Sequence, residues 1–239
     1  SAVYYATLFG AKVLLGSATP SLESYYNALQ GKYGLVILNE RYGGVKLPKI
    51  EIIDTRQIVR KDKSKVMLSP QLKAAMEKAL ETNRQVILFQ NRRGYSPDVS
   101  LTYHKLSNRL VCHYCGTSYP NATTCAACGS HVFQQRNFGT EKIEEYLEET
   151  FPKARIARMD IDSVRGKHAH DSLIQLFEQK RIDILVGTQM VVKGLDFEHV
   201  SVVGILDADS LFSFADFRVN ERAFQLMEQV SGRAGRKEE

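Results

Sequence analysis

Residues 69–91 read SPQLKAAMEKALETNRQVILFQN, and this stretch predicts the fold of the chain. Ser69 is a suitable N-cap, and Pro70 takes the first helical position, where a missing N–H costs nothing. The helix is expected to end near Thr82. The continuous apolar run after it is typical of a strand buried on both faces. A helix joined to such a strand is the repeating unit of a parallel sheet with crossover helices.

The same alternation runs along the rest of the chain. We expect further helices over residues 21–30, 140–150, 169–179 and 220–230, and strands at 12–15, 35–38, 50–53, 154–160, 183–189 and 200–209. Residues 101–136 interrupt this rhythm, because they show no strong period and contain all four cysteines. We therefore predict an α/β fold, a parallel sheet flanked by helices, with a small cysteine-rich insertion whose core is too thin to fold unaided.

Length and composition are ordinary for a globular protein. The chain has 239 residues, of which 44% are hydrophobic and 25% charged. No apolar run approaches the ~18 residues that span a bilayer, and the first residues lack the features of a signal peptide. The chain does not begin with Met, as expected of a fragment. Its net charge of +5 is compatible with a polyanionic partner but by itself decides nothing.

The cysteines form two C-x-x-C pairs, and a glycine follows each pair. The four are Cys112, Cys115, Cys125 and Cys128. Each pair presents two thiolates on one tight turn, and two such turns supply the four ligands of a tetrahedral zinc site. A site with only protein ligands is structural, because no position is open for water. Reduced free cysteines, a redox pair, or ligation by His104, His113 or His131 are the alternatives.

Four segments combine polar residues with glycine. They are GSATPS (residues 16–21), NRRGY (91–95), GTQMVVKGLDF (187–197) and QVSGRAGR (229–236). The first three follow predicted strands, and in an open parallel sheet ligands bind beyond the carboxyl ends of strands. We therefore expect them at one edge of the sheet.

The chemistry of these segments suits phosphate. Hydroxyls come from Ser17, Thr19 and Thr188, close backbone approach from Gly187 and Gly194, and cations from Arg92, Arg93, Lys193, Arg233 and Arg236. The last two arginines are three residues apart and would share a helical face. Taken singly, each feature also has a structural explanation: Thr19 as a helix cap, the first arginine pair as a solvated surface, and the second as a basic turn.

Together with the cysteine pairs, these segments resemble the superfamily-2 DNA helicases, and within them the primosomal replication-restart helicases. FGTEKIEEYLEETFPKARIARMDIDS (138–163) and DFRVNERAFQLMEQV (216–230) share the resemblance, which covers nearly the whole chain. It implies RecA-like P-loop NTPase lobes with ATP between them and DNA across both. The expected domains are the end of a first lobe (1–38), a connector (39–68) and a second lobe (69–239) interrupted by a zinc-binding insertion (101–136).

The resemblance also assigns roles to residues. It implies catalytic contacts to ATP phosphates by Gln229, Arg233 and Arg236, nucleotide contacts by Gly194 and Asp196, coupling by Ser17 and Thr19, and DNA contacts by Thr188, Gln189, Lys193, Arg92 and Arg93. The implied activity is ATP-dependent 3′-to-5′ unwinding of stalled forks during primosome assembly. It implies zinc and ATP with Mg as cofactors, DNA, other primosome proteins and single-strand-binding protein as partners, no membrane, and a place in the bacterial cytoplasm with the nucleoid.

The sequence departs from the family in two ways. It contains no G-x-x-x-x-G-K-[ST] loop and no acidic metal-holding motif, both expected upstream, so this chain alone should hydrolyse essentially no ATP. The family carries eight cysteines that hold two zinc ions in an interleaved pairing. Only four are present here, which leaves open a single four-cysteine site or two half-sites.

Two alternative functions remain at this point. One is a different superfamily-2 motor, such as a DNA repair translocase. The other is a non-enzymatic zinc-ribbon module that binds nucleic acid from an α/β scaffold.

Overall fold

The computed structural model describes residues 2–39, 48–56, 58, 67–90, 101–104, 109–112, 116–120, 124, 140–160, 169–188, 197–212 and 216–232. The chain divides into two compact units, Ser1–Gly44 and Val45–Glu239. Within the described ranges, every helix is too short or too polar to cross a lipid bilayer.

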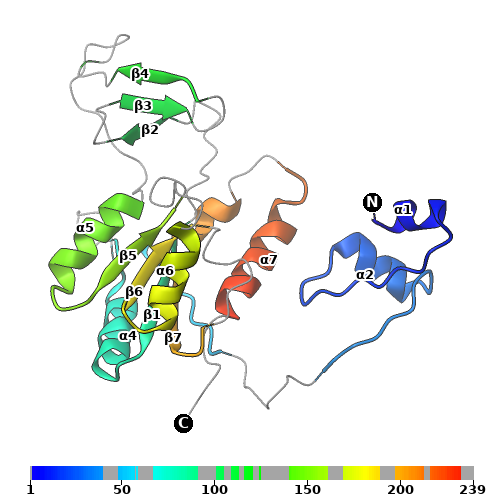
Figure 1. The fold of residues 1–239 in the computed structure, drawn as a ribbon, viewed down its shortest axis with the longest axis horizontal. Coiled ribbons are helices and arrows are strands. Elements are labelled where there is room, and N and C mark those ends of the chain that lie inside the picture. The colour runs from blue at the N-terminus through cyan, green and yellow to red at the C-terminus, as the bar shows by residue number, and fades with distance from the viewer. Residues whose placement is uncertain are drawn as a thin grey trace. The chain divides into compact units, whose positions relative to one another are not determined.

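A four-stranded parallel sheet forms the centre of the larger unit (Figure 1). Its spatial order is β5 (Ile156–Met159), β6 (Ile184–Gly187), β1 (Gln85–Gln90) and β7 (Val200–Leu206). All three neighbouring pairs are parallel. The predicted parallel sheet is therefore confirmed, and so is each of the four strands that build it.

Helices cover both faces of this sheet, and the side chains of β1 alternate between these faces and enter three hydrophobic clusters. Val86 and Leu88 pack with α4 (Pro70–Glu81) and α5 (Thr140–Thr150). Ile87 packs with α6 (Ala169–Glu178), and Phe89 packs with α7 (Val219–Ser231) and the short 3-10 helix η3 (Ala208–Phe212). The two-residue period of a strand thus decides which helix meets which face.

The predicted helix start at residue 69 is confirmed in detail. The Oγ of Ser69 accepts a hydrogen bond from the backbone N–H of Leu72 at 3.1 Å, and Pro70 is the first helical residue. The helix ends at Glu81, and Asn83 then takes a positive φ of 54° as the chain turns into β1.

The strand β7 differs from its neighbours. Every residue of β1 and β6 is buried, as expected for strands covered on both faces, but Ser201 is exposed and Val202 and Val203 are half-buried. The reason is position, since β7 lies at an edge of the sheet and pairs with β1 only, among the residues that the structure describes. A groove of about 800 Å³ lies at this edge, and its lining includes Pro48–Ile53 and residues of β7, η3 and α7.

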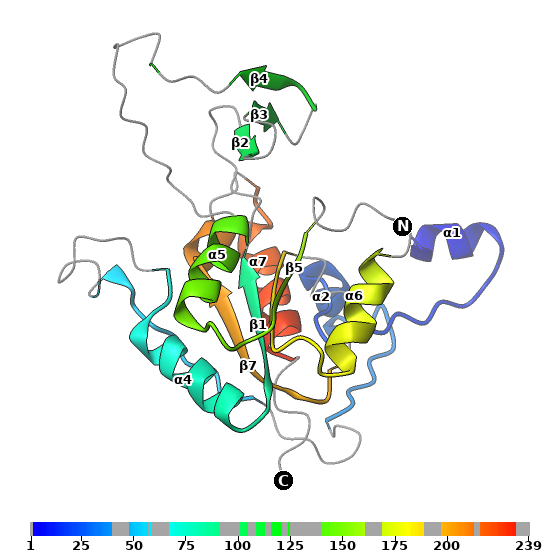
Figure 2. The same ribbon diagram turned by 60° about the vertical axis from the view of Figure 1, so that its left-hand side comes forward.

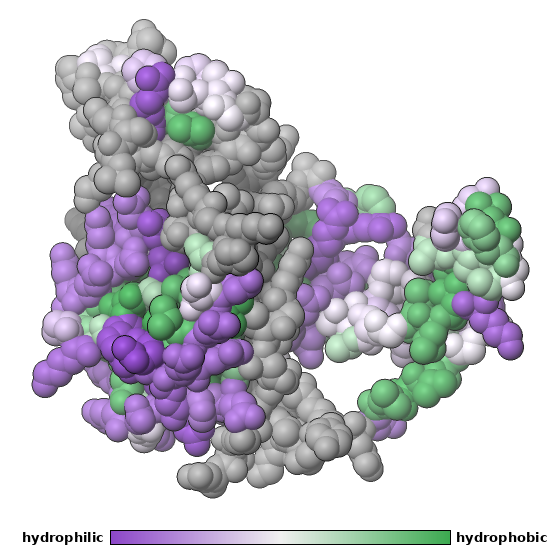
Figure 3. Space-filling view, viewed as in Figure 1, coloured by the Kyte–Doolittle hydropathy of each residue, from purple (hydrophilic) through white to green (hydrophobic). Residues whose placement is uncertain are grey.

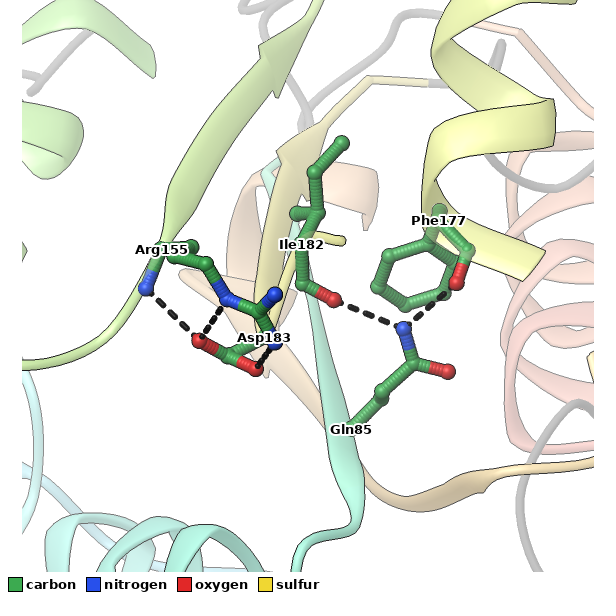
Figure 4. A network of polar contacts seen from close by, with 5 residues as sticks. All are labelled: Gln85, Arg155, Phe177, Ile182 and Asp183. Carbon is green, nitrogen blue, oxygen red and sulfur yellow. Dashed lines mark hydrogen bonds and ion pairs between the residues drawn. The ribbon is translucent and has the colours of Figure 1, made fainter. Parts of the chain in front are cut away.

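Polar contacts at the amino edge of the sheet tie the strand starts together (Figure 4). The Nε2 of Gln85, a buried residue, donates to the carbonyl oxygens of Phe177 at 2.6 Å and Ile182 at 2.7 Å. Arg155 meets Asp183 through two side-chain hydrogen bonds of 2.9 and 2.6 Å and through its backbone N–H at 2.8 Å. These hydrogen bonds lower the pKa of Asp183 below its ordinary value.

The cysteine-rich region contains a second, antiparallel sheet. Its strands are β2 (Leu101–His104), β3 (Arg109–Cys112) and β4 (Ser118–Pro120), with β3 in the middle. Residues 101–136 show no strong period in the sequence, and no strand was predicted among them. Strands of three or four residues are too short to show a two-residue period, so the prediction missed them.

The smaller unit contains α1 (Ala2–Leu8) and α2 (Leu22–Leu29). The strands expected at 12–15 and 35–38 are absent, and Leu14 (97%) and Leu38 (87%) are exposed. Figure 3 shows hydrophobic side chains at the surface of this unit in green. The expectation was wrong for a physical reason: a strand needs a partner for its backbone groups, and none of the described residues of this unit supplies one.

The connector also differs from expectation. Residues 50–53, Ile-Glu-Ile-Ile, form no strand, so the strand expected there is absent. Ile52 is 94% exposed there. Nearby, Asp54 accepts hydrogen bonds from the backbone and guanidinium of Arg56.

Candidate functional site at the carboxyl edge of the sheet

The strand register brings the ends of neighbouring strands to one edge. Met159 of β5, Gly187 of β6 and Phe89 of β1 are aligned, since the first pairs with the second and the second with the third. The next residues along these strands are Asp160, Thr188 and Gln90, so they line the carboxyl edge of the sheet. Ligands of open parallel sheets bind at this edge.

Two of the predicted motif segments begin here on adjacent strands. Thr188 is half-buried, and its N–H reaches the carbonyl oxygen of Met159 at 3.4 Å. Beside it, β1 ends at the buried Gln90, directly before residues 91–95 in the sequence. The remaining predicted residues of these segments lie outside the described residues: Arg92, Arg93, Gln189, Lys193, Gly194 and Asp196.

A buried polar cluster that the sequence analysis missed supports this edge. Asp160 is completely buried and accepts a 2.5 Å hydrogen bond from the Oγ1 of Thr140, the first residue of α5. Arg158 lies 3.1 Å from Asp160 and 3.1 Å from Glu144. Burial raises the pKa of Glu144, and Arg158 opposes that rise. The only available signal was a carboxylate at the last position of a predicted strand, residues 154–160.

This cluster fixes the end of β5 to the start of α5. A carboxylate removed from water is stable only if cations and donors surround it, as Arg158 and Thr140 do here. The Asp160 side chain therefore has a structural role at the edge that it shares with Thr188.

The segment QVSGRAGR (residues 229–236) begins on the last turn of α7. Gln229 is exposed, whereas Val230 is buried beside Phe89 in the sheet core. The helix ends at Ser231, and the N–H of Gly232 bonds back to the carbonyl of Glu228 at 3.0 Å. Arg233 and Arg236 lie outside the described residues, so their expected common face stays a prediction.

The segment GSATPS (residues 16–21) belongs to the smaller unit. The N–H of Thr19 donates to the Oγ of Ser17 at 3.0 Å, which closes a tight local turn. The cap of α2 is Ser21, whose Oγ accepts from the N–H of Ser24 at 3.2 Å. Thr19 is therefore not the helix cap, and that structural explanation for it no longer applies.

The cysteine pairs are described only in part. Cys112 is the last residue of β3, and Gly116 precedes β4, so the first C-x-x-C-G joins two neighbouring antiparallel strands. Gly116 has a φ of 72°, the left-handed turn that a zinc knuckle requires of the glycine after its pair. Cys115, Cys125 and Cys128 lie outside the described residues, within which no three potential ligands cluster.

Comparison with known families agrees with this geometry. The helicase conserved C-terminal domain matches residues 130–238, which include β5, β6, β7 and α7. The PriA DNA helicase Cys-rich region (CRR) domain matches residues 98–120, which include β2, β3 and β4. The fold is therefore an α/β helicase lobe with a parallel sheet flanked by helices and a cysteine-rich insertion.

Curated relatives cover nearly the whole chain. The replication restart protein PriA of Bacillus subtilis (strain 168) is 42% identical over 95% of this chain and 30% of its own length. The PriA proteins of Chlamydia pneumoniae and Rickettsia felis are 41% and 38% identical over 98% and 99% of this chain, and over 34% and 39% of their own lengths. The chain thus spans roughly one third of the relatives it matches, and by these matches it belongs to the family of PriA replication restart proteins.

Proposed function

We propose that this chain carries the second motor lobe, the end of the first lobe (residues 1–38), a connector (39–68) and the zinc-binding insertion (101–136) of an ATP-dependent DNA helicase. The helicase would move 3′ to 5′ on stalled forks and support primosome assembly. One observation carries the proposal: β6 and β1 are adjacent, end at the same edge, and lead directly into two helicase-like segments.

The edge can hold a nucleic-acid backbone. Thr188 offers a hydroxyl there, and the adjoining Gln189, Lys193, Arg92 and Arg93 would add donors and positive charge for phosphates and sugars. Contacts of this kind position a strand without reading its sequence, which suits a motor that moves along DNA.

The nucleotide contacts would come from the segments nearer the chain's end. Gly194 and Asp196 would approach the nucleotide, and Gln229, Arg233 and Arg236 would meet its phosphates. ATP with Mg would be held mainly by the other lobe, and Ser17 and Thr19 would couple its hydrolysis to movement. In phosphoryl transfer, arginine fingers stabilise the charge of the transition state.

The cysteine pairs would hold structural zinc. With Cys112 at the end of β3 and a left-handed Gly116 before β4, the first pair fits one half of a ligand set, and Cys125 and Cys128 would supply the other half. The insertion would then engage DNA strands or partner proteins, namely other primosome proteins and single-strand-binding protein. The proposed location is the bacterial cytoplasm, with the nucleoid.

The experiment measures DNA-stimulated ATP hydrolysis in two proteins. The chain alone should show none. A longer protein that adds the phosphate-binding loop should show hydrolysis that Arg236→Ala reduces by about 10³-fold or more. Arg236→Lys keeps the charge but loses the planar fork, and it should also be strongly impaired. Hydrolysis by the chain alone, or an Arg236→Ala variant with normal turnover, would refute the proposal.

A further inference from the structure

Phe217 stands out among the aromatic residues of the larger unit. It is 89% exposed, compared with 61% for Phe224 and 43% for Phe212, and it is the most exposed aromatic side chain that the structure describes. Burying a phenylalanine side chain gains about 1.5–3 kcal/mol. A ring left almost wholly in water contributes almost none of this free energy. The stability of the fold therefore does not explain why a phenylalanine stands at position 217.

One guanidinium group lies over this ring, and a second is held by a carboxylate close by in the sequence. The central guanidinium carbon of Arg218 lies 5.1 Å from the centroid of the Phe217 ring, within the range of a cation–π contact. Arg222 follows one turn along α7, and its Nη1 lies 2.6 Å from a carboxylate oxygen of Asp216. Because Phe217 is 89% exposed, its ring still presents area to solvent beside the guanidinium of Arg218.

The turn that opens α7 lies at the same edge of the sheet as the candidate site. The chain passes from the carboxyl end of β7 into η3 and then to α7. Leu211 of η3 and Ala223 of α7 pack in one cluster with Phe89, next to the last residue of β1. In Figure 2 the arrowheads of β1 and β7 point toward the orange ribbon of η3.

The order of the strands in the sheet therefore gives the order in which their ends follow one another along the carboxyl edge. The strands β6, β1 and β7 are consecutive neighbours. A ligand that runs along this edge passes Thr188 after β6, then the end of β1, and then Phe217 beyond β7. Proteins that bind single strands combine a positively charged groove with aromatic rings on which successive bases stack.

We propose that Phe217 stacks on a base of single-stranded DNA, while Arg218 and Arg222 lie beside the adjoining phosphates. This rests on the proposed function, since it assumes that a DNA strand follows the carboxyl edge. It adds a base contact to a site whose other predicted residues reach only the sugar-phosphate backbone. Stacking tolerates every base, so the contact would hold the strand without selecting a sequence.

A tryptophan in place of the ring reports the contact directly. The chain contains no Trp, so Phe217→Trp introduces a single indole fluorophore at an exposed position. Titration with an oligothymidylate should quench its emission and saturate with binding. A Phe224→Trp variant is the matched control, because that ring lies on α7, two turns beyond Phe217 in the sequence, but lines the groove beside β7. Quenching equal to that of the control would overturn the proposal.

Binding affinity gives the second readout. Phe217→Ala should weaken binding of a fluorescein-labelled oligothymidylate by about 5- to 100-fold, the range for loss of one stacked base. On an abasic oligonucleotide, which keeps the phosphates and lacks the bases, the same variant should bind like the unchanged chain. Phe224→Ala should change neither affinity.

The outcomes separate this inference from the proposed function. If the unchanged chain binds the oligonucleotide, and Phe217→Ala binds it equally well, the stacking contact is refuted and the motor assignment stands. If the unchanged chain does not bind single-stranded DNA at all, both are refuted. If Phe217→Ala loses as much affinity for the abasic oligonucleotide as for the oligothymidylate, stacking is also refuted, because the ring would then act through the phosphate contacts.

Discussion

Replacing Gln85 tests the structural account of the sheet most sharply. Its side-chain amide donates two hydrogen bonds to carbonyl oxygens in a buried position. In Gln85→Met, a side chain of similar length keeps the packing and loses both donors. The Phe177 carbonyl still accepts from the N–H of Lys180 at 3.0 Å, so that loss should cost about 1 kcal/mol.

The second carbonyl sets the size of the effect. No other described donor reaches the oxygen of Ile182, and a buried acceptor left without a partner costs about 1–3 kcal/mol. Gln85→Met should therefore lower the free energy of unfolding by about 2–4 kcal/mol. Urea unfolding followed by far-ultraviolet circular dichroism measures this. A loss below about 0.5 kcal/mol would refute the reasoning, because surface substitutions commonly reach that value.

Gln85→Glu adds a dependence on pH. A carboxylate has no proton to donate to two carbonyl oxygens, so burial should raise its pKa in the folded state above the unfolded value near 4.3. The stability of this variant is then fullest below that pH and is lost as pH rises through the folded pKa. At pH 7 it should be less stable than Gln85→Met, and the gap should narrow toward pH 4. A gap that does not change with pH would contradict the assigned hydrogen bonds.

Three further predictions concern single side chains. Arg155 lowers the pKa of Asp183, so Asp183→Asn should cost about 1 kcal/mol of unfolding free energy at pH 7. This difference should vanish as pH falls below 3.8 through the lowered pKa, and urea unfolding at pH 7 and at a pH below that pKa measures it. Ser69→Ala removes the cap of α4 and should cost about 1 kcal/mol in urea, whereas Ser69→Gly should cost only a few tenths. Asp160→Ala leaves Arg158 without one of its carboxylates and should cost about 3 kcal/mol, and a thermal melt unchanged from that of the unaltered chain would contradict the structural role given to the buried cluster.

The elements of the parallel sheet could be predicted because their signals are local. A cap and a proline mark the start of α4, and the apolar run after it needs burial on both faces. The edge that carries Thr188 followed from the same reasoning, since parallel strands end together. The predictions of strands at 12–15, 35–38 and 50–53 were wrong. An apolar run indicates that a segment could be a strand, but it does not show whether a neighbouring strand is present to pair with it.

The buried hydrogen bonds could not be predicted, because they join segments that are distant in the sequence and no local pattern indicates them. The hydrogen bond from Thr140 to Asp160 joins residues 20 positions apart, and those of Gln85 join residues 92 and 97 positions apart. An exposed phenylalanine such as Phe217 has no periodic pattern, so only its exposure in the structure and its position beside Arg218 identify it.

The one-sided pairing of β7 has a practical consequence for shorter versions of this chain. Within the described residues the seven-residue β7 pairs along one side only, and a strand side without a partner can template another strand, so proteins usually shield it. Here Pro48–Ile53 line the same groove as β7. A truncation that begins after these residues would uncover the strand, and such a product should form dimers and larger aggregates through strand-to-strand association in concentrated solution.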